Sequence, residues 1–157
     1  MPPKYALVEI ERRWLLDTNT LPALDALPCR AISDLYVRGT GLRVRRVDEA
    51  GRPTVYKLCK KYNLAPALSR PITNLYLSEA EYALLIELPG QRVHKRRYTL
   101  AGGTLDIYAD GLAVFEVEFD SEQAALNYQP PEFARREVTH DPAFSGATLA
   151  SHTKQQP

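Results

Sequence analysis

A chain of 157 residues is long enough for one domain with a hydrophobic core, and its composition, 45% hydrophobic and 25% charged, is ordinary for a folded protein. The net charge of +1, from 20 basic and 19 acidic residues, lacks the basic excess of a nucleic-acid or membrane-surface binder. The two cysteines, Cys29 and Cys59, belong to no CxxC or Cys/His cluster, which argues against a structural zinc site and a disulfide framework.

Most of the chain is predicted to form short strands, because runs of alternating polar and apolar residues are separated by turn signals. Examples of these turns are Arg38-Gly39-Thr40-Gly41 and Ala101-Gly102-Gly103. We expect strands at residues 5–15, 32–38, 42–48, 54–62, 72–77, 92–100, 104–109 and 113–119.

Two helices are expected beside these strands. Ser78 can cap the first, Glu81 can complete a capping box, and Pro89-Gly90 ends the helix. The second helix starts near Asp120-Ser121 and ends before Pro130-Pro131. A weaker helical pattern covers residues 21–27.

The pattern of elements is typical of a β-rich α+β fold, with mostly antiparallel strands and a few helices packed outside the sheet. We expect a single domain over residues 1–150 and a disordered tail over residues 151–157. No segment approaches the roughly 20 apolar residues that span a bilayer, and the N-terminus has no uninterrupted apolar run, so we expect a cytoplasmic protein. A monomer or a homodimer is compatible with these features.

Charged residues recur with a period of two along several of the expected strands, and residues two apart in a strand point the same way. For one strand alone, a charged face turned to solvent is the simpler interpretation. Several such strands favour a closed barrel, because like charges on an open face repel unless opposite charges lie between them. The sets that share a face are Glu9 with Glu11 and Arg13, Arg43 with Arg45, Lys95 with Arg97, and Glu116 with Glu118, while Asp106 alternates with apolar neighbours.

A barrel interior lined by charges of both signs suits a polyphosphate ligand with divalent metal. Arginine and lysine bind phosphate oxygens, and arginine does so with two parallel hydrogen bonds. Carboxylates hold Mg²⁺ or Mn²⁺, which share their coordination with phosphate oxygens. Together these groups neutralise charge that develops during phosphoryl transfer.

The same motifs, in this order, resemble those of the CYTH superfamily, also called triphosphate tunnel metalloenzymes, over roughly residues 8–150. Glu9-Ile10-Glu11-Arg12-Arg13 looks like the family's ExExK signature. The family includes inorganic triphosphatases, thiamine triphosphatases and class IV adenylate cyclases. The resemblance implies an eight-stranded antiparallel closed β-barrel whose charged residues point inward. Further matches are residues 42–45 with the RxR strand, 95–98 with the KxRY segment, 105–108 with the strand that carries an inward Asp, 116–119 with the ExE strand, and 137–142 and 149–150 with the closing segment.

The resemblance also implies roles for individual residues. It implies catalytic roles for Arg13, Asp106 and Glu116, where Asp106 could ligate a metal, orient a basic residue or position water. Lys60 is the preferred match to an inward lysine of the family, and Lys57 replaces it if the strand register slips by one face. The phosphate-binding set is Arg43, Arg45, Lys60, Lys95 and Arg97, and the set that would hold Mg²⁺ or Mn²⁺ is Glu9, Glu11, Glu116 and Glu118.

The sequence departs from the family pattern at three places. Arg13 stands where the signature usually has lysine, and an arginine cannot act as a general base. Thr73 and Asn74 occupy a strand in which many members carry further acids. Residues 145–148 replace a stretch that often contains asparagine, so we assign no site there.

The function expected from the sequence is metal-dependent hydrolysis of a triphosphate, most directly inorganic tripolyphosphate. Two alternatives remain open. One is nucleotide chemistry, as a nucleotide or thiamine triphosphatase or a class IV adenylate cyclase. The other is a non-catalytic module that binds polyphosphate, which the missing acids at residues 72–77 favour.

Overall fold

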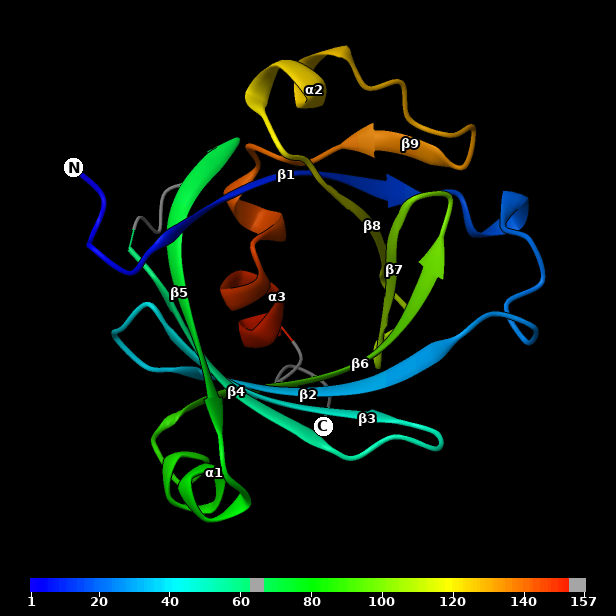
Figure 1. Ribbon diagram of the computed structural model, residues 1–157. Helices are drawn as coiled ribbons and strands as arrows, with labels where there is room; N and C mark the ends of the chain where they lie inside the picture. The colour runs from blue at the N-terminus through cyan, green and yellow to red at the C-terminus, as the bar shows by residue number, and fades with distance from the viewer. Residues whose placement is uncertain (63–66, 153–157) are drawn as a thin grey trace.

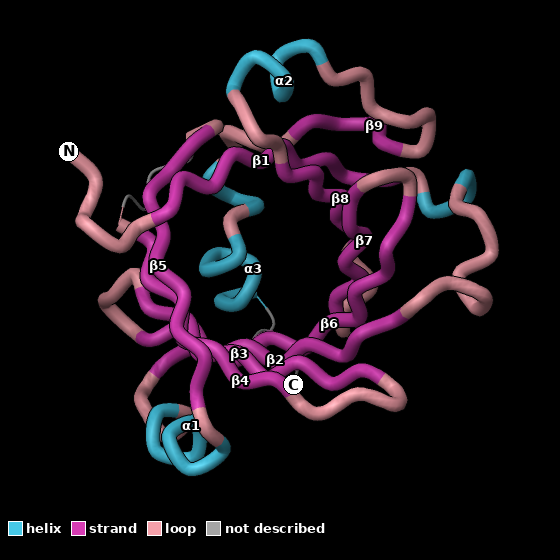
Figure 2. The backbone as a smooth tube through the Cα atoms, viewed as in Figure 1, coloured by secondary structure: helices cyan, strands magenta, loops and turns pink. Residues whose placement is uncertain are grey.

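The computed structural model describes residues 1–62 and 67–152, and in it eight antiparallel strands close into a barrel (Figure 1). The strand order is β5-β4-β3-β2-β6-β7-β8-β1, and pairing between β5 and β1 joins the two edges. The predicted closed barrel is therefore confirmed, and Figure 2 shows the ring of strands along its axis. The strands are β1 (Leu7–Leu16), β2 (Cys29–Val37), β3 (Leu42–Glu49), β4 (Val55–Lys61), β5 (Ser69–Leu77), β6 (Gly90–Leu100), β7 (Gly103–Tyr108) and β8 (Ala113–Glu118).

The turn between β6 and β7 illustrates how local sequence fixes the strand register. Leu100 pairs with Gly103, which leaves a two-residue loop. Both loop residues have positive φ, 51° at Ala101 and 76° at Gly102. Such geometry matches the twist of a tight hairpin. It aligns Lys95 and Arg97 of β6 with Tyr108 and Asp106 of β7.

Apolar clusters on the outer face of the barrel lie under helices and loops, as expected. Helix α1 (Glu79–Leu85) carries the predicted capping box between Ser78 and Glu81, and its Tyr82 packs near Leu35 and Val44 of the sheet. Helix α2 (Glu122–Asn127) is capped by Ser121. None of the helices among the described residues is long and apolar enough to cross a membrane.

A ninth strand, β9 (Ala134–Glu137), was not predicted. It pairs with residues 14–16 of β1 outside the closed ring. The connection between α2 and β9 brings Phe133 against Trp14 and Phe115. This cluster packs on the outer side of β1 and β8, the two strands that carry Glu9, Glu11, Glu116 and Glu118.

The predicted helix at residues 21–27 is wrong. A short 3₁₀ helix, η1 (Thr18–Thr20), is followed by bends and a turn. Pro22 and Pro28 bracket the segment, and the residue before a proline disfavours helical geometry. The leucines instead pack on Tyr98 and Leu105 at the outer face of the sheet.

A helix also lies inside the barrel, which corrects the expectation that all helices pack outside. After η2 (Pro142–Phe144), helix α3 (Gly146–His152) occupies the centre of the ring in Figure 1. A Cβ at Gly146 would collide with the Tyr36 hydroxyl, so glycine permits the close approach. Residues 151–152, expected in a disordered tail, belong to this helix, and residues 153–157 lie outside the described residues.

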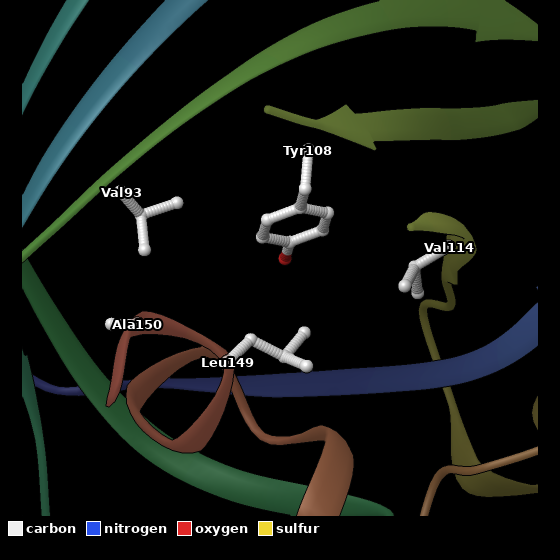
Figure 3. Close-up of a cluster of buried hydrophobic side chains, with 5 residues drawn as sticks. All are labelled: Val93, Tyr108, Val114, Leu149 and Ala150. Atoms are coloured by element: carbon white, nitrogen blue, oxygen red, sulfur yellow. The ribbon is translucent and has the colours of Figure 1, made fainter. Parts of the chain in front are cut away.

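Figure 3 shows the apolar cluster around α3, in which Leu149 and Ala150 face Val93, Tyr108 and Val114. Burial of these side chains stabilises the inserted helix. The apolar cluster also marks which face of β6, β7 and β8 points into the barrel.

Candidate active site

The strand registers direct the predicted charged residues into the barrel. Leu15, Val93, Tyr108 and Val114 pack in the cluster around α3, so residues an even number of positions away along the same strands share the inner face. By this rule the predicted inner sets are Glu9, Glu11 and Arg13 on β1, Lys95 and Arg97 on β6, Asp106 on β7, and Glu116 and Glu118 on β8.

Asp106 is fully buried and lies at the centre of the basic side of the interior. It accepts hydrogen bonds from Lys95 Nζ at 2.5 Å and from two nitrogens of Arg97 at 2.6 Å each. Both carboxylate oxygens are thus engaged by cations. This geometry matches one of the roles considered for Asp106, orientation of basic residues.

Glu116 connects this basic group to β1. Arg97 Nη2 donates to Glu116 Oε2 at 2.9 Å, and Arg13 Nε donates to Glu116 Oε1 at 3.0 Å. Burial acts to raise the pKa of Glu116, but the surrounding cations, led by Arg13 and Arg97, hold it well below its ordinary value. Glu116 is therefore ionised at neutral pH.

A second buried ion pair was not anticipated from the sequence. Asp34 on β2 accepts hydrogen bonds from Arg45 Nε and Nη2, both at 2.7 Å, and Asp34 is only 2% exposed. Although burial acts to raise its pKa, Arg45 lowers the pKa of Asp34 to about 2. Asp34 lies two positions from Ile32 and from Tyr36 on the same face of β2, and a single acid among these residues gives no period-two pattern of charge.

Arg43 differs from its neighbour Arg45. Its Nε atom is buried, and no acceptor for it is found within the described parts of the chain. Buried donors normally have partners, because an unpaired one carries a desolvation cost. The geometry thus leaves Arg43 with a buried donor for an anionic ligand.

Glu9, Glu11 and Glu118 complete the acidic side. Glu9 pairs with Lys61 Nζ at 3.1 Å, while Glu118 is exposed at the end of β8. Burial and the nearby carboxylates of Glu116 and Glu9 raise the pKa of Glu11 to about 7. A buried carboxylate beside other carboxylates is stabilised when it binds either a proton or a metal cation.

The acidic residues fit a hard divalent metal by the chemistry of their donor atoms. Carboxylate oxygens suit Mg²⁺ and Mn²⁺, and the mutual repulsion at Glu11 would be relieved by a cation. No group of three acidic, histidine or cysteine residues is gathered for a metal ion in residues 1–62 and 67–152. Because Glu116 is held by arginines, these donors do not form a complete cage by themselves.

The expectation that Lys60 points into the barrel is wrong. Lys60 is opposite Leu42 of β3, and Leu42 packs in the outer cluster beneath α1. The alternative, Lys57, is opposite Arg45 and lies on the inner face, as does Lys61. Lysines occur on both faces of β4, so the sequence alone did not decide between them.

The three departures from the family pattern have distinct structural settings. Arg13 donates to Glu116 through Nε and to the Phe144 carbonyl through Nη1, so two different nitrogens of the guanidinium serve the two acceptors. Thr73 lies on the outer face and bonds Tyr62, whereas Asn74 is opposite Cys59 on the inner face. Ser145 caps α3 by accepting from the Thr148 amide.

Comparisons with known proteins agree with this architecture. No protein-family model matches the chain. An inorganic triphosphatase from Nitrosomonas europaea is 31% identical over 153 residues, which cover 92% of this chain and 97% of the relative. A crystal structure of the inorganic triphosphatase NE1496 has a TM-score of 0.54 and 28% identity, covering 90% of this chain and 93% of the other. A second crystal structure, described as the hypothetical protein NE1496, has a TM-score of 0.53 and 28% identity, covering 90% and 97%.

A closed antiparallel barrel with acids and bases gathered in its interior defines a tunnel-type fold. The relative from Nitrosomonas europaea matches almost the full length of both chains. This chain belongs to the CYTH superfamily, the triphosphate tunnel metalloenzymes.

Proposed function

We propose that this protein hydrolyses inorganic triphosphate inside its barrel, with Mg²⁺ or Mn²⁺ as cofactor. The observation that carries the proposal is the meeting of basic and acidic side chains at Glu116, which bonds both Arg97 and Arg13 within the barrel interior. The buried Nε of Arg43, which has no acceptor among the described residues, also supports an anionic ligand. The name of the relative, inorganic triphosphatase, supports the choice of substrate.

In this proposal the basic residues bind the phosphate chain. Arg43, Arg45, Lys95 and Arg97 donate hydrogen bonds to its oxygens. Asp34 and Asp106 hold Arg45, Lys95 and Arg97 in place before the ligand arrives. Such preorganisation lowers the entropic cost of binding and positions the terminal phosphate for attack.

Hydrolysis consists of attack by water on a terminal phosphorus and rupture of the adjacent phosphoanhydride bond. The products are orthophosphate and pyrophosphate. Arg13 and Arg97 stabilise negative charge on the reacting phosphate and the leaving group. Arg13 stays protonated and cannot accept the proton of the attacking water, so that proton passes to an acidic residue of the inner face.

The metal would be held by carboxylates drawn from Glu9, Glu11, Glu116 and Glu118, with phosphate oxygens as further ligands. When bound, Mg²⁺ or Mn²⁺ supplies positive charge that offsets the phosphates and lowers the pKa of water. The release of Glu116 from one arginine would accompany this arrangement, since phosphate offers the arginine a new acceptor.

The test compares phosphate release from tripolyphosphate, ATP and thiamine triphosphate during titration with Mg²⁺ and Mn²⁺, together with an assay for cyclic AMP. We expect the highest kcat/KM for tripolyphosphate and complete loss of turnover in a chelator. Cyclic AMP as the main product would instead identify an adenylate cyclase. Tripolyphosphate that raises Tm yet is recovered intact after long incubation with both metals would identify a non-catalytic polyphosphate-binding module.

A further inference from the structure

A second concave site lies on the outer side of the barrel wall, away from the charged interior. It is a cleft of ≈190 Å³ between the outer faces of β2, β3 and β6 and the end of α1, a helix that lies outside the ring of strands (Figure 1). The polar side chains that define this outer cleft are Ser33, Arg46, Tyr82, Arg92 and His94.

The strand registers explain why the wall is hollow at this place. Ser33 on β2 is directly opposite His94 on β6 and Arg46 on β3. One short side chain therefore lies between two long ones in a row that crosses three strands. Val93 packs inside the barrel, so His94 and Arg92 on either side of it face outward. The floor of the outer cleft is thus set by the small Ser33.

The outer cleft carries a net positive charge, because its two carboxylates are already engaged. Asp48 accepts hydrogen bonds from Arg46 Nε at 2.8 Å and from Arg46 Nη2 at 3.1 Å. Asp34 is held by Arg45 on the inner side of the wall. Arg92 is exposed, and within residues 1–62 and 67–152 it forms no ion pair. The positive charge that remains therefore belongs to Arg92.

Hydrogen-bond donors reach the outer cleft from several directions. Arg92 Nη2 donates to the Ile86 carbonyl at 2.7 Å, which orients the guanidinium at the end of α1. His94 Nδ1 lies 3.0 Å from Ser33 Oγ, so the other ring nitrogen is left for a ligand. Burial raises the pKa of Tyr82, so its hydroxyl remains a donor at neutral pH. Donors that approach from a helix and from different strands suit the tetrahedral oxygens of phosphate better than a planar carboxylate.

We propose that the outer cleft binds a small phosphate-type oxyanion, free orthophosphate, at a site separate from the barrel interior. The inference does not depend on the proposed function. Strand β2 separates the two regions, because Ser33 faces outward while Asp34 faces inward and holds Arg45. The cleft is smaller than the roughly 300 Å³ at which pockets for drug-sized ligands begin, so it fits a free ion rather than a nucleotide.

The experiment follows the ring signals of His94 by NMR during titration with sodium phosphate, at fixed pH and ionic strength and without divalent metal. The His94→Gln variant identifies these signals by their loss. We expect a saturable change in chemical shift with a Kd of about 1–10 mM, a range typical of weak, partly exposed sites. Sodium chloride at the same ionic strength should give no such change. An equal response to chloride would overturn the site, since it would reflect general charge screening.

Two variants locate the bound ion. Arg92→Gln should raise the Kd for phosphate about three- to tenfold, because it removes the charge that no carboxylate offsets. Ser33→Val should also weaken binding, because it fills the floor of the cleft with a residue that suits a strand. Arg96→Gln is the matched control, since Arg96 is exposed on the outer face of β6 opposite Ala31 and outside the cleft. It should change the Kd less than about twofold.

An unchanged Kd in Arg92→Gln or in Ser33→Val would overturn the outer site and would indicate that phosphate acts from the barrel interior. Titration with O-phosphoserine separates a free ion from a phosphorylated chain. Tighter binding of O-phosphoserine than of orthophosphate would contradict the assignment to the free ion. None of these measurements involves turnover, so absence of tripolyphosphate hydrolysis would contradict the proposed function and leave the test of the outer cleft intact.

Discussion

Arg13 on β1 and Glu116 on β8 are direct cross-strand partners, and their side chains form a 3.0 Å ion pair inside the barrel. The same carboxylate accepts a hydrogen bond from Arg97 on β6. Glu116 on β8 thereby connects β1 to β6 through its contacts with Arg13 and Arg97. Its position between two arginines explains why it is ionised despite burial.

Replacement of Glu116 by glutamine should abolish most of the turnover. The variant retains the shape of the side chain but loses the charge that binds metal and orients Arg13 and Arg97. We expect a decrease in kcat of about a hundredfold or more, in the range measured for preorganised electrostatic groups. The measurement is kcat for tripolyphosphate hydrolysis with Mg²⁺ or Mn²⁺. Glu132→Gln, at an exposed position, is the control. Wild-type turnover in Glu116→Gln would contradict the assignment.

Asp34→Asn should destabilise the fold, because it leaves Arg45 buried without its counter-charge. Removal of one partner from a buried ion pair costs about 3–5 kcal/mol. Urea denaturation of the variant would measure this loss, with Asp25→Asn at an exposed position as the control. Added tripolyphosphate should restore part of the stability, since it offers Arg45 a new anion. Equal unfolding free energies for variant and wild type would show that Asp34 is dispensable.

The stability of the protein should depend on the protonation of Glu11. Its pKa is 4.5 in a solvated chain and about 7 in the fold, so between these values the folded protein keeps a proton that the unfolded chain has released. Stability contributed by Glu11 is therefore present at low pH and is lost as the pH rises through this window. The slope is at most about 1.4 kcal/mol per pH unit, which gives a total of about 1–3 kcal/mol.

Glu11→Gln tests this dependence, because glutamine does not titrate. Relative to wild type, the variant should gain in Tm as the pH increases from about 5 to about 8. Excess Mg²⁺ should reduce the difference by stabilising the ionised carboxylate of the wild-type protein. Parallel curves of Tm against pH for the two proteins would exclude a raised pKa at Glu11.

Arg12 should matter for stability although it points away from the barrel interior. Two of its nitrogens donate to Glu137 at 2.8 and 2.7 Å, and Nη1 donates to the carbonyls of Ala125 and Tyr128 at 2.7 and 3.1 Å. Its guanidinium also stacks 4.9 Å from the centre of the Trp14 ring. These contacts fasten α2 and β9 to the outer side of β1.

Arg12→Lys keeps the charge but cannot reproduce this set of hydrogen bonds. We expect a loss of about 1–3 kcal/mol, because Glu137 is partly exposed and the pair is partly screened. Chemical denaturation measures the free energy of unfolding of Arg12→Lys and of the control Arg135→Lys. The Arg135 side chain is about half exposed and lies 3.5 Å from Asp17. Equal effects of the two substitutions would remove any special role for Arg12.

The barrel and most of its charged interior could be predicted because strand periodicity is a local property. Glu9, Glu11 and Arg13 follow one another at intervals of two residues, and the pleat alone places them on one face. By the same alternation Arg46 and Arg96 should face outward, and both are exposed.

The remaining features depend on contacts that periodicity does not encode. Lys60 was misplaced because β4 has lysines on both faces, and only its pairing with β3 fixes which of them point inward. The role of Asp34 depends on its hydrogen bond from Arg45, which lies on another strand. The insertion of α3 depends on space beside Tyr36 and on the apolar inner ends of several strands, which no single segment reveals.

The central claim is that the triphosphate binds within the barrel, between the basic and acidic side chains that meet at Glu116. A crystal structure of the Glu116→Gln variant with tripolyphosphate and Mn²⁺ tests it most directly. We predict three phosphates in the interior, in contact with Arg43, Arg45, Lys95 and Arg97, and a metal between phosphate oxygens and the glutamates that remain in the variant. Tripolyphosphate bound only on the outer surface of the barrel, with these four side chains still in their unliganded positions, would contradict the account.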